Sequence, residues 1–490
     1  MENIRFDFNN MFNVNIGSAH GVEDSDISEI SKEAERAHEH LSKVVNDSQS
    51  RIKLSLEWMR LPYQDAGFIK EIKALGDEIA KKYDNVISLG IGGSYLGLKA
   101  AQDALAAPYF NEFPGVRNKR PRIYFEGNNL DPDTLSTLLK NLNPKKTFVI
   151  VISKSGETTE TKAALVVVEN WLKKSLGKNY TRQVFAITDP ESGSLRKRVI
   201  EEQKKDKLSF RSLSLLKGVG GRFSEFNMGL LHLAIIGIDI NKVFSGAKDM
   251  ALRCSVSDYK NNPAYMYAIL HHILYRKKAK PLAIMMPFSE TLKSTADWYV
   301  QLLAESLGKK YSRKIMLAND GIEEWQRDKE NVINTGRTPI PCRGTNDLHS
   351  IQQNNIEGEN DKVVTFIRVK KFKTEIKVPG KGDILSGRSF SELMQLAQEA
   401  TEWALSREGR PSCTILIPEV NAYHWGALLF FFQVATAFEG ELLNVNAFDQ
   451  PGVEGYKNYM YFKLGKPGIS KSIIDEIKGN SLKKDPKYII

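Results

Sequence analysis

The chain has 490 residues and a formal net charge of +10, with 41% hydrophobic and 26% charged residues. This length exceeds what a single hydrophobic core usually serves, so it predicts two domains of similar size. Basic residues are spread among almost as many acids, 69 against 59, and no basic run is interleaved with aromatics, which argues against nucleic-acid binding.

Membrane insertion, secretion and a metal site are also disfavoured. The longest apolar run, residues 426–438, is interrupted by Gln433 and predicts a buried helix. The N-terminus carries acidic residues where a secretory signal needs a basic start and an apolar stretch. The three cysteines lie far apart, without metal-ligand or disulfide spacing. We therefore expect a cytoplasmic protein without a bound metal.

Short runs rich in Val, Ile and Leu predict buried strands of parallel sheets, with helical patterns such as residues 159–174 between them. This alternation occurs twice and predicts two doubly wound α/β domains, with an N-terminal arm and a C-terminal helical tail. The first series comprises residues 85–89, 122–125, 147–152 and 183–187, and the second 281–286, 314–317, 362–369 and 413–417. The expected boundaries are 1–50 for the arm, 51–225 and 260–445 for the domains, and 446–490 for the tail.

A glycine-rich loop, residues 90–94 (GIGGS), follows the first predicted strand. Glycines allow backbone N–H groups to approach an anion closely, and Ser94 adds a hydroxyl beside Gly93. Tyr95 stands where a dinucleotide fingerprint needs its third glycine, and Leu98 stands where a P-loop needs lysine. The loop therefore indicates an anion site of another kind, or simply a tight turn between strand and helix.

A second loop carries three hydroxyls after the strand at residues 147–152. Ser153, Lys154, Ser155 and Thr158 belong to the sequence SKSGET, directly before a predicted helix. Hydroxyls and the N–H groups of the first helical turn form a nest for phosphate oxygens. A helix cap is the alternative, but one residue would suffice for a cap. We favour a phosphate site.

The third loop, residues 218–224, reads GVGGRFS and turns the backbone so that Arg222 is aimed in a fixed direction. A fixed guanidinium suits a developing oxyanion and suits a structural ion pair equally well.

The candidate base is Glu305, in the last turn of a helix predicted over residues 292–307, with Gly308 as its C-terminal stop. Gln301 lies four residues earlier and therefore on the same face. The negative end of the helix dipole opposes ionisation of Glu305, and burial would raise its pKa further, toward the range of a general base. An ordinary surface glutamate is the alternative.

Two further segments carry polar groups suited to proton transfer. His349 ends the sequence GTNDLH, whereas the pair His271-His272 predicts helix packing. Residues 448–457 (FDQPGVEGYK) hold Gln450 and Lys457 within a tight turn, where Lys457 is either a donor to a sugar oxygen or a surface lysine.

Together these segments resemble the glucose-6-phosphate isomerase family. The most specific matches are residues 220–224 (GGRFS) and 448–454 (FDQPGVE) followed by Lys457, and four further segments agree in order. The agreement runs from about residue 86 to 457, and the length is similar to that of the shorter bacterial branch.

The resemblance implies two sugar-isomerase (SIS) domains, a homodimer and an aldose–ketose isomerisation of a sugar phosphate without a cofactor. It assigns the phosphate to the loop of Ser153, Ser155 and Thr158, with Gly93 and Ser94 nearby. It makes Glu305 the base that moves a proton between C2 and C1 and Arg222 the group that stabilises the enediolate. His349, expected from the partner subunit, and Lys457 would serve ring opening, while Gln301 and Gln450 match positions near the sugar.

One departure from the family and two rival functions bear on this expectation. Glu225 stands where the family usually has a small or apolar residue, and an acid there is placed to pair with Arg222 and weaken its hold on the enediolate. An amino-sugar isomerase would share the serine loop but lack FDQPGVE. A sugar-phosphate sensor would need no base, so the joint presence of Glu305, Arg222, His349 and Lys457 disfavours it.

Overall fold

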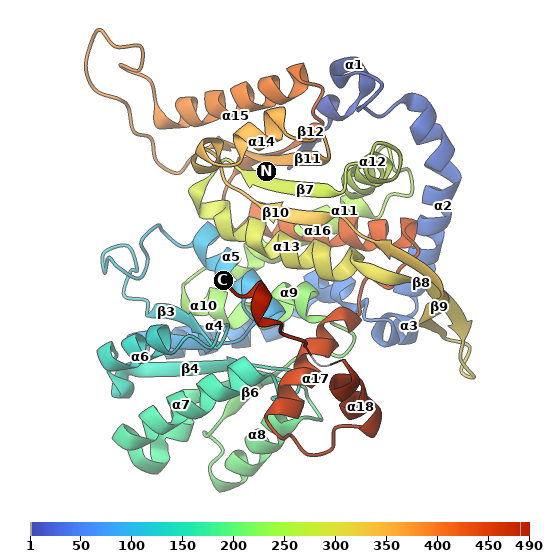
Figure 1. The fold of residues 1–490 in the computed structure, drawn as a ribbon. Coiled ribbons are helices and arrows are strands. Elements are labelled where there is room, and N and C mark those ends of the chain that lie inside the picture. The colour runs from blue at the N-terminus through green and yellow to red at the C-terminus, as the bar shows by residue number, and fades with distance from the viewer. Residues whose placement is uncertain (1, 481) are drawn as a thin grey trace. The chain divides into compact units, whose positions relative to one another are not determined.

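The computed structural model describes residues 2–480 and 482–490. It divides the chain into two units, one that ends at Ala447 and one that comprises Phe448–Ile490. The three sheets of the described residues all belong to the first unit, and the second unit consists of helices and connecting turns (Figure 1).

Five parallel strands form the first sheet, and its inner strands are buried along their whole length, as a parallel sheet covered on both faces requires. Four of the five coincide with predicted runs, whereas the polar edge strand at residues 211–214 was not predicted. The order is β3 (Arg122–Glu126), β2 (Asn85–Leu89), β4 (Thr147–Ile152), β5 (Val184–Thr188) and β6 (Arg211–Ser214).

Helices cover both faces of this sheet (Figure 1). On one face α6 (Pro132–Asn141), α7 (Thr159–Leu176) and α8 (Ser194–Lys205) pack on alternate strand residues. On the other face lie α4 (Ala66–Lys82) and α10 (Leu230–Ile235), which pack against each other. The doubly wound arrangement predicted for this half of the chain is thus confirmed.

The second sheet contains four parallel strands and one antiparallel edge strand contributed by the N-terminus. Its apolar face toward α14 (Gln352–Glu357) and α15 (Phe390–Arg407) forms a separate core cluster. On the opposite face lie α12 (Pro263–Lys277) and α13 (Lys293–Leu307). The order is β1 (Arg5–Asp7), β12 (Ser412–Glu419), β11 (Lys362–Lys371), β7 (Leu282–Pro287) and β10 (Thr338–Pro341).

A central helix, α16 (Ala422–Leu442), is buried nearly all round, which is typical of a helix that is apolar on every side. It contains the run predicted to be a buried helix. It packs against α11 (Ile240–Cys254), α12 and α13, and also against α5 (Leu96–Leu105). Since α5 follows the first strand of one sheet and α13 follows the first parallel strand of the other, this packing joins the two halves.

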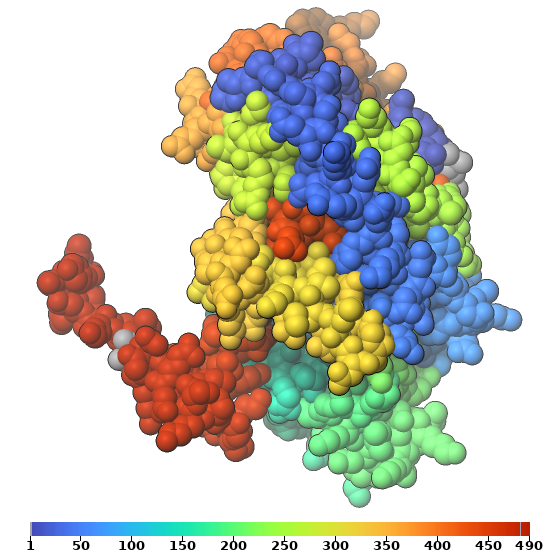
Figure 2. All heavy atoms as spheres, turned by 90° about the vertical axis from the view of Figure 1, so that its right-hand side faces the viewer, coloured from blue at the N-terminus to red at the C-terminus, as the bar shows by residue number. Residues whose placement is uncertain are grey.

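The strand predicted at residues 314–317 exists, but its assignment to the second parallel sheet was wrong. It belongs to β8 (Lys309–Leu317), which pairs antiparallel with β9 (Glu323–Thr335) in a two-stranded hairpin. The connection is a tight turn in which Ala318 N donates to Ile322 O and Gly321 has a φ of +76°. The hairpin lies beside the N-terminal helix α2 (Asp24–Asn46), as Figure 2 shows.

The remaining elements are short. The α-helices are α1 (Asn13–Ile16), α3 (Ser48–Lys53) and α9 (Glu225–Met228) in the first unit, and α17 (Glu454–Lys463) and α18 (Lys471–Gly479) in the second. The 3₁₀ helices are η1 (Asn9–Met11), η2 (Glu57–Tyr63), η3 (Gly92–Ser94), η4 (Pro144–Lys146), η5 (Gly177–Gln183), η6 (Gly221–Phe223), η7 (Glu290–Leu292), η8 (Asn346–His349), η9 (Pro451–Val453) and η10 (Pro486–Tyr488).

Candidate active site

Two of the predicted anion loops lie side by side at a topological switch point. From β2 the chain crosses to β3 on one side and then returns to β4 on the other. Because β2 and β4 are parallel neighbours, with Leu89 opposite Val151, residues 90–94 and 153–158 leave the same edge of the sheet. The crevice at such a switch point is where open α/β sheets bind ligands.

The glycine-rich loop touches the turn that carries Arg222. A Cβ atom on Gly93 would lie 2.3 Å from the carbonyl carbon of Gly221 and 2.8 Å from the backbone N of Arg222. A Cβ on Gly92, whose φ is +56°, would lie 2.9 Å from Nε2 of Gln301. Glycine is therefore required at Gly93 by close packing, and the loop brings Arg222 and Gln301 to the edge of the first sheet where β2 ends.

The serine loop is a compact turn before α7. Ser153 is buried, and its Oγ accepts a hydrogen bond from Gly156 N at 3.0 Å. Ser155 is exposed, and its Oγ accepts from Glu157 N at 3.1 Å. Thr158 is the N-cap residue of α7, yet its side chain makes no capping hydrogen bond. The simple capping alternative therefore does not account for Thr158. Lys154 is exposed at the same turn.

Arg222 is held from several directions and is 3% exposed. Its Nε donates to Ser306 Oγ at 2.8 Å, and its NH2 donates to the carbonyl of Ala447 at 2.6 Å. Its NH1 lies 3.2 Å from Oε2 of Glu305. The fork geometry of arginine satisfies these partners together and fixes the direction of the guanidinium.

Glu305 lies in the last turn of α13, as predicted, but its surroundings differ from the expected ones. Its side chain keeps 29% of its exposure and contacts the Arg222 guanidinium, so it is neither deeply buried nor without a counter-charge. Gln301 Nε2 donates to its Oε1 at 3.3 Å, which confirms that the two side chains share one face. Gly308 follows the helix as predicted but has a φ of −71°, so its left-handed freedom is not used.

The expected pairing of Glu225 with Arg222 was wrong. Glu225 is buried and its carboxylate accepts hydrogen bonds from Trp298 Nε1 and Gln433 Nε2, each at 2.8 Å. Burial raises the pKa of Glu225 to about 8. Among the residues that the model describes, no ion pair joins it to Arg222, whose charge instead faces Glu305.

His349 lies near the opposite end of α13 from Glu305. The segment that carries it is anchored at the carboxyl end of β7, where Gly344 packs on Phe288 and Arg343 pairs with Glu290. From the start of α13 at Lys293 to Glu305 the helix rises by roughly 18 Å. The segment that leads to His349 therefore begins near the end of α13 that is remote from Glu305. The pair His271-His272 is buried in α12, as predicted.

Gln450 and Lys457 belong to the second unit. Gln450 directly precedes η9, and Lys457 lies in the first turn of α17, where its Nζ is 3.0 Å from Glu454 Oε1. The roles that the family resemblance gives them stay predictions.

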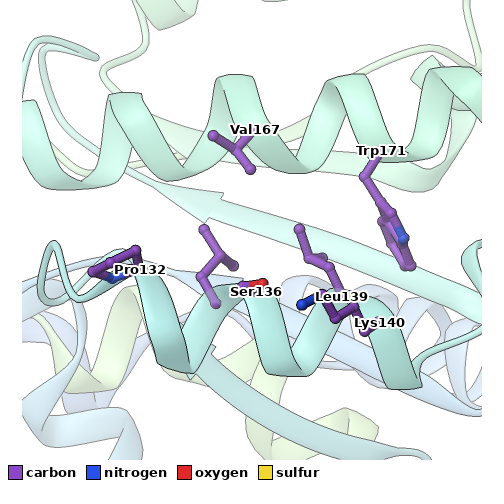
Figure 3. Close-up of a pocket in the computed structure, with 7 residues that line it drawn as sticks. Pro132, Ser136, Leu139, Lys140, Val167 and Trp171 are labelled. Carbon is purple, nitrogen blue, oxygen red and sulfur yellow. The ribbon is translucent and has the colours of Figure 1, made fainter.

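A cavity of about 360 Å³ adjoins the serine loop and is lined in part by Ser153 and Gly156. Another cavity is separate from the loops. A groove of about 390 Å³ runs between α6 and α7 and is mostly apolar, with Leu139, Val167 and Trp171 in its walls (Figure 3). None of its lining residues belongs to the loops of Ser94, Ser153 or Arg222. In the described part of the chain, no three His, Cys, Asp or Glu side chains are grouped to hold a metal ion. None of the described helices combines the length and apolarity needed to cross a membrane.

Sequence reasoning missed two groups that support Arg222. Ser306 follows the candidate base directly, and the carbonyl of Ala447 lies 225 residues further along the chain than Arg222. The position of Ser306 directly after the candidate base was the one sequence feature that pointed to its hydroxyl. A backbone carbonyl carries no signal in its residue type, so no sequence pattern identifies it.

The chain matches the family model described as phosphoglucose isomerase over residues 64–475. It is 37% identical over 456 residues to a glucose-6-phosphate isomerase of Carboxydothermus hydrogenoformans, covering 92% of this chain and 93% of that protein. A hypothetical protein from Thermus thermophilus has a TM-score of 0.78 at 30% identity and covers 94% of this chain and 99% of that one. A glucose-6-phosphate isomerase from Chlamydia trachomatis shares the fold, with a TM-score of 0.71 at 21% identity, and covers 94% of this chain and 90% of that one. These matches confirm the predicted fold class and the predicted resemblance: the chain belongs to the phosphoglucose isomerase family.

Proposed function

We propose that Glu305 is the base of the reaction that this aldose–ketose isomerase catalyses, the interconversion of glucose 6-phosphate and fructose 6-phosphate. A C–H bond next to a carbonyl is weakly acidic, so its proton is removed only by a positioned base with the resulting oxyanion stabilised. The observation that carries the proposal is the contact between Glu305 Oε2 and Arg222 NH1 at 3.2 Å.

The proton transfer needs no group beyond these side chains and the sugar. Glu305 takes the proton from C2 of the open-chain aldose, and the electron pair forms the C1–C2 double bond while O1 becomes anionic. The hydroxyl proton of O2 passes to O1, and Glu305 returns its proton to C1, which leaves the carbonyl at C2. The Arg222 guanidinium supplies positive charge beside the oxygen on which charge develops.

The phosphate group is assigned to the serine loop and the glycine-rich loop. Ser153, Ser155, Thr158 and Ser94 leave neighbouring strand ends, and the start of α7 adds backbone N–H groups and a favourable dipole. Lys154 adds a positive charge at the same turn. The phosphate is remote from C1 and C2, so binding it supplies energy that holds the reacting carbons at Glu305. Gln301, and Gln450 of the second unit, are assigned to the sugar.

Ring opening is assigned to His349 and Lys457, with His349 from a second copy of the chain. Support comes from the segment that leads to His349, which Arg343 anchors to Glu290 near the end of α13 that is remote from Glu305. The enzyme would then be a homodimer whose sites are shared. A cytoplasmic location follows from the reaction, a step of glycolysis and gluconeogenesis, and from the three scattered cysteines.

Mixing two inactive variants tests this sharing. In a two-fold dimer, a chain with Glu305→Gln and a chain with His349→Ala form hybrids in which one site has both native residues, so random mixing returns about a quarter of the activity. A His349 that acts within its own chain gives no recovery.

The decisive experiment for the base is Glu305→Gln in a coupled assay that converts fructose 6-phosphate to glucose 6-phosphate. We expect loss of turnover while a phosphate-bearing analogue, 6-phosphogluconate, still binds by calorimetry. Near-normal turnover in this variant removes Glu305 from the mechanism. The same assay separates the isomerase from an amino-sugar isomerase and from a non-catalytic sensor, because glucose 6-phosphate is the expected product of neither.

A further inference from the structure

Glu225 is a buried acid beside the proposed site that the proposed reaction does not use. It begins α9, three residues after Arg222, and is 4% exposed. Its Oε1 accepts from Trp298 on α13 and its Oε2 from Gln433 on α16, each at 2.8 Å. Both carboxyl oxygens thus tie the turn that carries Arg222 to helices from the other half of the first unit.

Glu225 and Arg222 anchor α13 at two separate points. Trp298 lies seven residues, or about two helical turns, before Glu305 and therefore on a similar face of the helix. Arg222 contacts Ser306, eight residues beyond Trp298 and roughly 12 Å further along the helix axis. Two contacts this far apart fix both the position and the tilt of α13 against one short turn.

The glycine at the start of α5 makes room for this carboxyl. A Cβ on Gly97 would lie 2.5 Å from Glu225 Cγ and 2.8 Å from its Oε1. A side chain at Gly97 would therefore displace Glu225 from its partners. The helix that follows the glycine-rich loop, the turn of Arg222, the helix of Glu305 and the central helix all meet at this carboxyl.

We propose that Glu225 is a positioning residue that holds α13 in place against the Arg222 turn and so sets the geometry between Arg222 and Glu305. The inference rests on the roles proposed above for these two residues. Rate is sensitive to such placement, because a misplacement of 1 Å at a reacting group costs on the order of 10²-fold. Substrate binding through the serine loop is less sensitive, because that loop follows β4 of the first sheet, whereas the Glu225 carboxyl is bonded to α13 and α16.

Two substitutions at Glu225 separate positioning from mere filling of space. Glu225→Ala leaves the Trp298 and Gln433 donors without their acceptor. Glu225→Gln keeps the shape and one acceptor, and its new amide finds a partner when Gln433 turns by 180°. The Oε1 atom of Gln433 has no hydrogen-bond partner within the described residues, so this turn removes no existing bond. Glu225→Gln should therefore keep the kcat that Glu225→Ala loses.

The experiment measures kcat and KM for fructose 6-phosphate in both variants. Asn262→Ala is the matched control, because Asn262 is a buried polar residue that caps α12 and bonds Cys254 and Val256. We expect Glu225→Ala to lower kcat by about 10-fold or more with little change in KM. We expect kcat close to wild type for Glu225→Gln, and a loss of stability without a loss of kcat per folded enzyme for Asn262→Ala.

Wild-type kcat in Glu225→Ala overturns the proposal, as does an equal loss of kcat in the alanine and glutamine variants. Should Glu225→Ala not fold, Trp298→Phe removes the Nε1 donor together with part of the buried ring, and it must still lower kcat. Glu305→Gln and Arg222→Ala are measured alongside. If these two keep their turnover, the proposed function itself is wrong; if they lose it while Glu225→Ala keeps it, only the positioning role is wrong.

Discussion

Arg222 NH1 lies 3.2 Å from Glu305 Oε2, so the proposed oxyanion donor and the proposed base are direct neighbours. The same guanidinium is fixed by Ser306 and by the carbonyl of Ala447. An arginine held on three sides keeps its direction while charge develops on the sugar, which is the condition for electrostatic stabilisation without reorganisation.

Removing this guanidinium is the first test. We expect Arg222→Ala to lower kcat by about 10²-fold or more, by analogy with the loss of other oxyanion donors. Arg222→Lys should resemble the alanine variant more than the wild type, because lysine lacks the planar fork that reaches Ser306 and Ala447 together. The coupled assay measures both variants. An unchanged kcat in Arg222→Ala makes the residue purely structural.

The contact between the glycine-rich loop and the Arg222 turn gives a second test with a matched control. Gly93→Ala places a methyl group 2.3 to 2.8 Å from the backbone of Gly221 and Arg222, so the turn must move. We expect a fall in kcat of about 10²-fold, since the guanidinium moves with it. Gly220→Ala is the control, because nothing lies within 4 Å of its Cβ position and its φ of −78° suits any residue. Equal activity of the two variants contradicts the argument.

The buried carboxyl of Glu225 predicts how stability changes with pH. Burial raises its pKa from 4.5 to about 8, so between these values the unfolded chain has released a proton that the folded chain still holds. The contribution of Glu225 to the free energy of unfolding is therefore largest below the pKa that it has in the unfolded chain, and it falls as the pH rises toward 8. Glutamine does not titrate.

Thermal unfolding from pH 5 to pH 9 measures this effect. We expect the midpoint of Glu225→Gln to gain on that of the wild type as pH rises, with the gain levelling off above about pH 8. A difference between the two midpoints that is constant over this range would count against a protonated Glu225.

His40 gives a second pH dependence, at the hairpin. Its Nδ1 lies 2.7 Å from Glu441 Oε2 and its Nε2 lies 2.9 Å from Glu323 Oε2. Both nitrogens face carboxylates, so both carry protons. Hydrogen bonding to Glu441, ahead of the opposing effect of burial, raises the pKa of His40. Arg313, paired with Glu441, opposes this rise, and Lys43 pairs with Glu323.

A histidine whose pKa is raised by folding stabilises the fold fully at a pH below its pKa in the unfolded chain, about 6.5. This stabilisation is lost as the pH rises through its pKa in the folded chain. We expect the midpoint difference between wild type and His40→Gln to be largest near pH 6 and to shrink at higher pH. We expect His40→Gln to retain activity, because the contacts of His40 described above involve none of the proposed site residues. Kinetics at each pH check this. If the midpoint difference widens as the pH rises, the assignment of a protonated His40 in the folded chain is wrong.

Much of the fold follows from local patterns. Runs such as residues 85–89 and 147–152 are apolar at successive positions because both faces of a parallel sheet are covered, and the pattern needs no partner to be read. Strand β10 escaped prediction because two of its four residues are prolines, which an edge strand tolerates. The strand at residues 314–317 was assigned to the wrong sheet, because the pattern of a strand does not indicate which strand it pairs with.

At the site, residue types predicted loops but not the direction in which side chains point. The loop at residues 90–94 was predicted from its glycines, because a close approach of the backbone requires glycine. The loop at residues 153–158 was predicted from its hydroxyls, because these residue types suit phosphate binding. Glu225 lies three residues after Arg222, and that spacing suggested a pair. The carboxyl points the other way because Trp298 and Gln433, distant in sequence, offer it donors.

The edge strand β1 has a consequence for biosynthesis. Arg5 pairs with Leu416, so β1 waits for a partner strand that is made about 410 residues later. At translation rates of ~5–20 residues per second, that delay is on the order of 20–80 s. During this interval residues 5–7 have no edge to join, and the nascent second sheet closes only near the end of synthesis. A tag fused directly before β1 would sit on this late-closing seam.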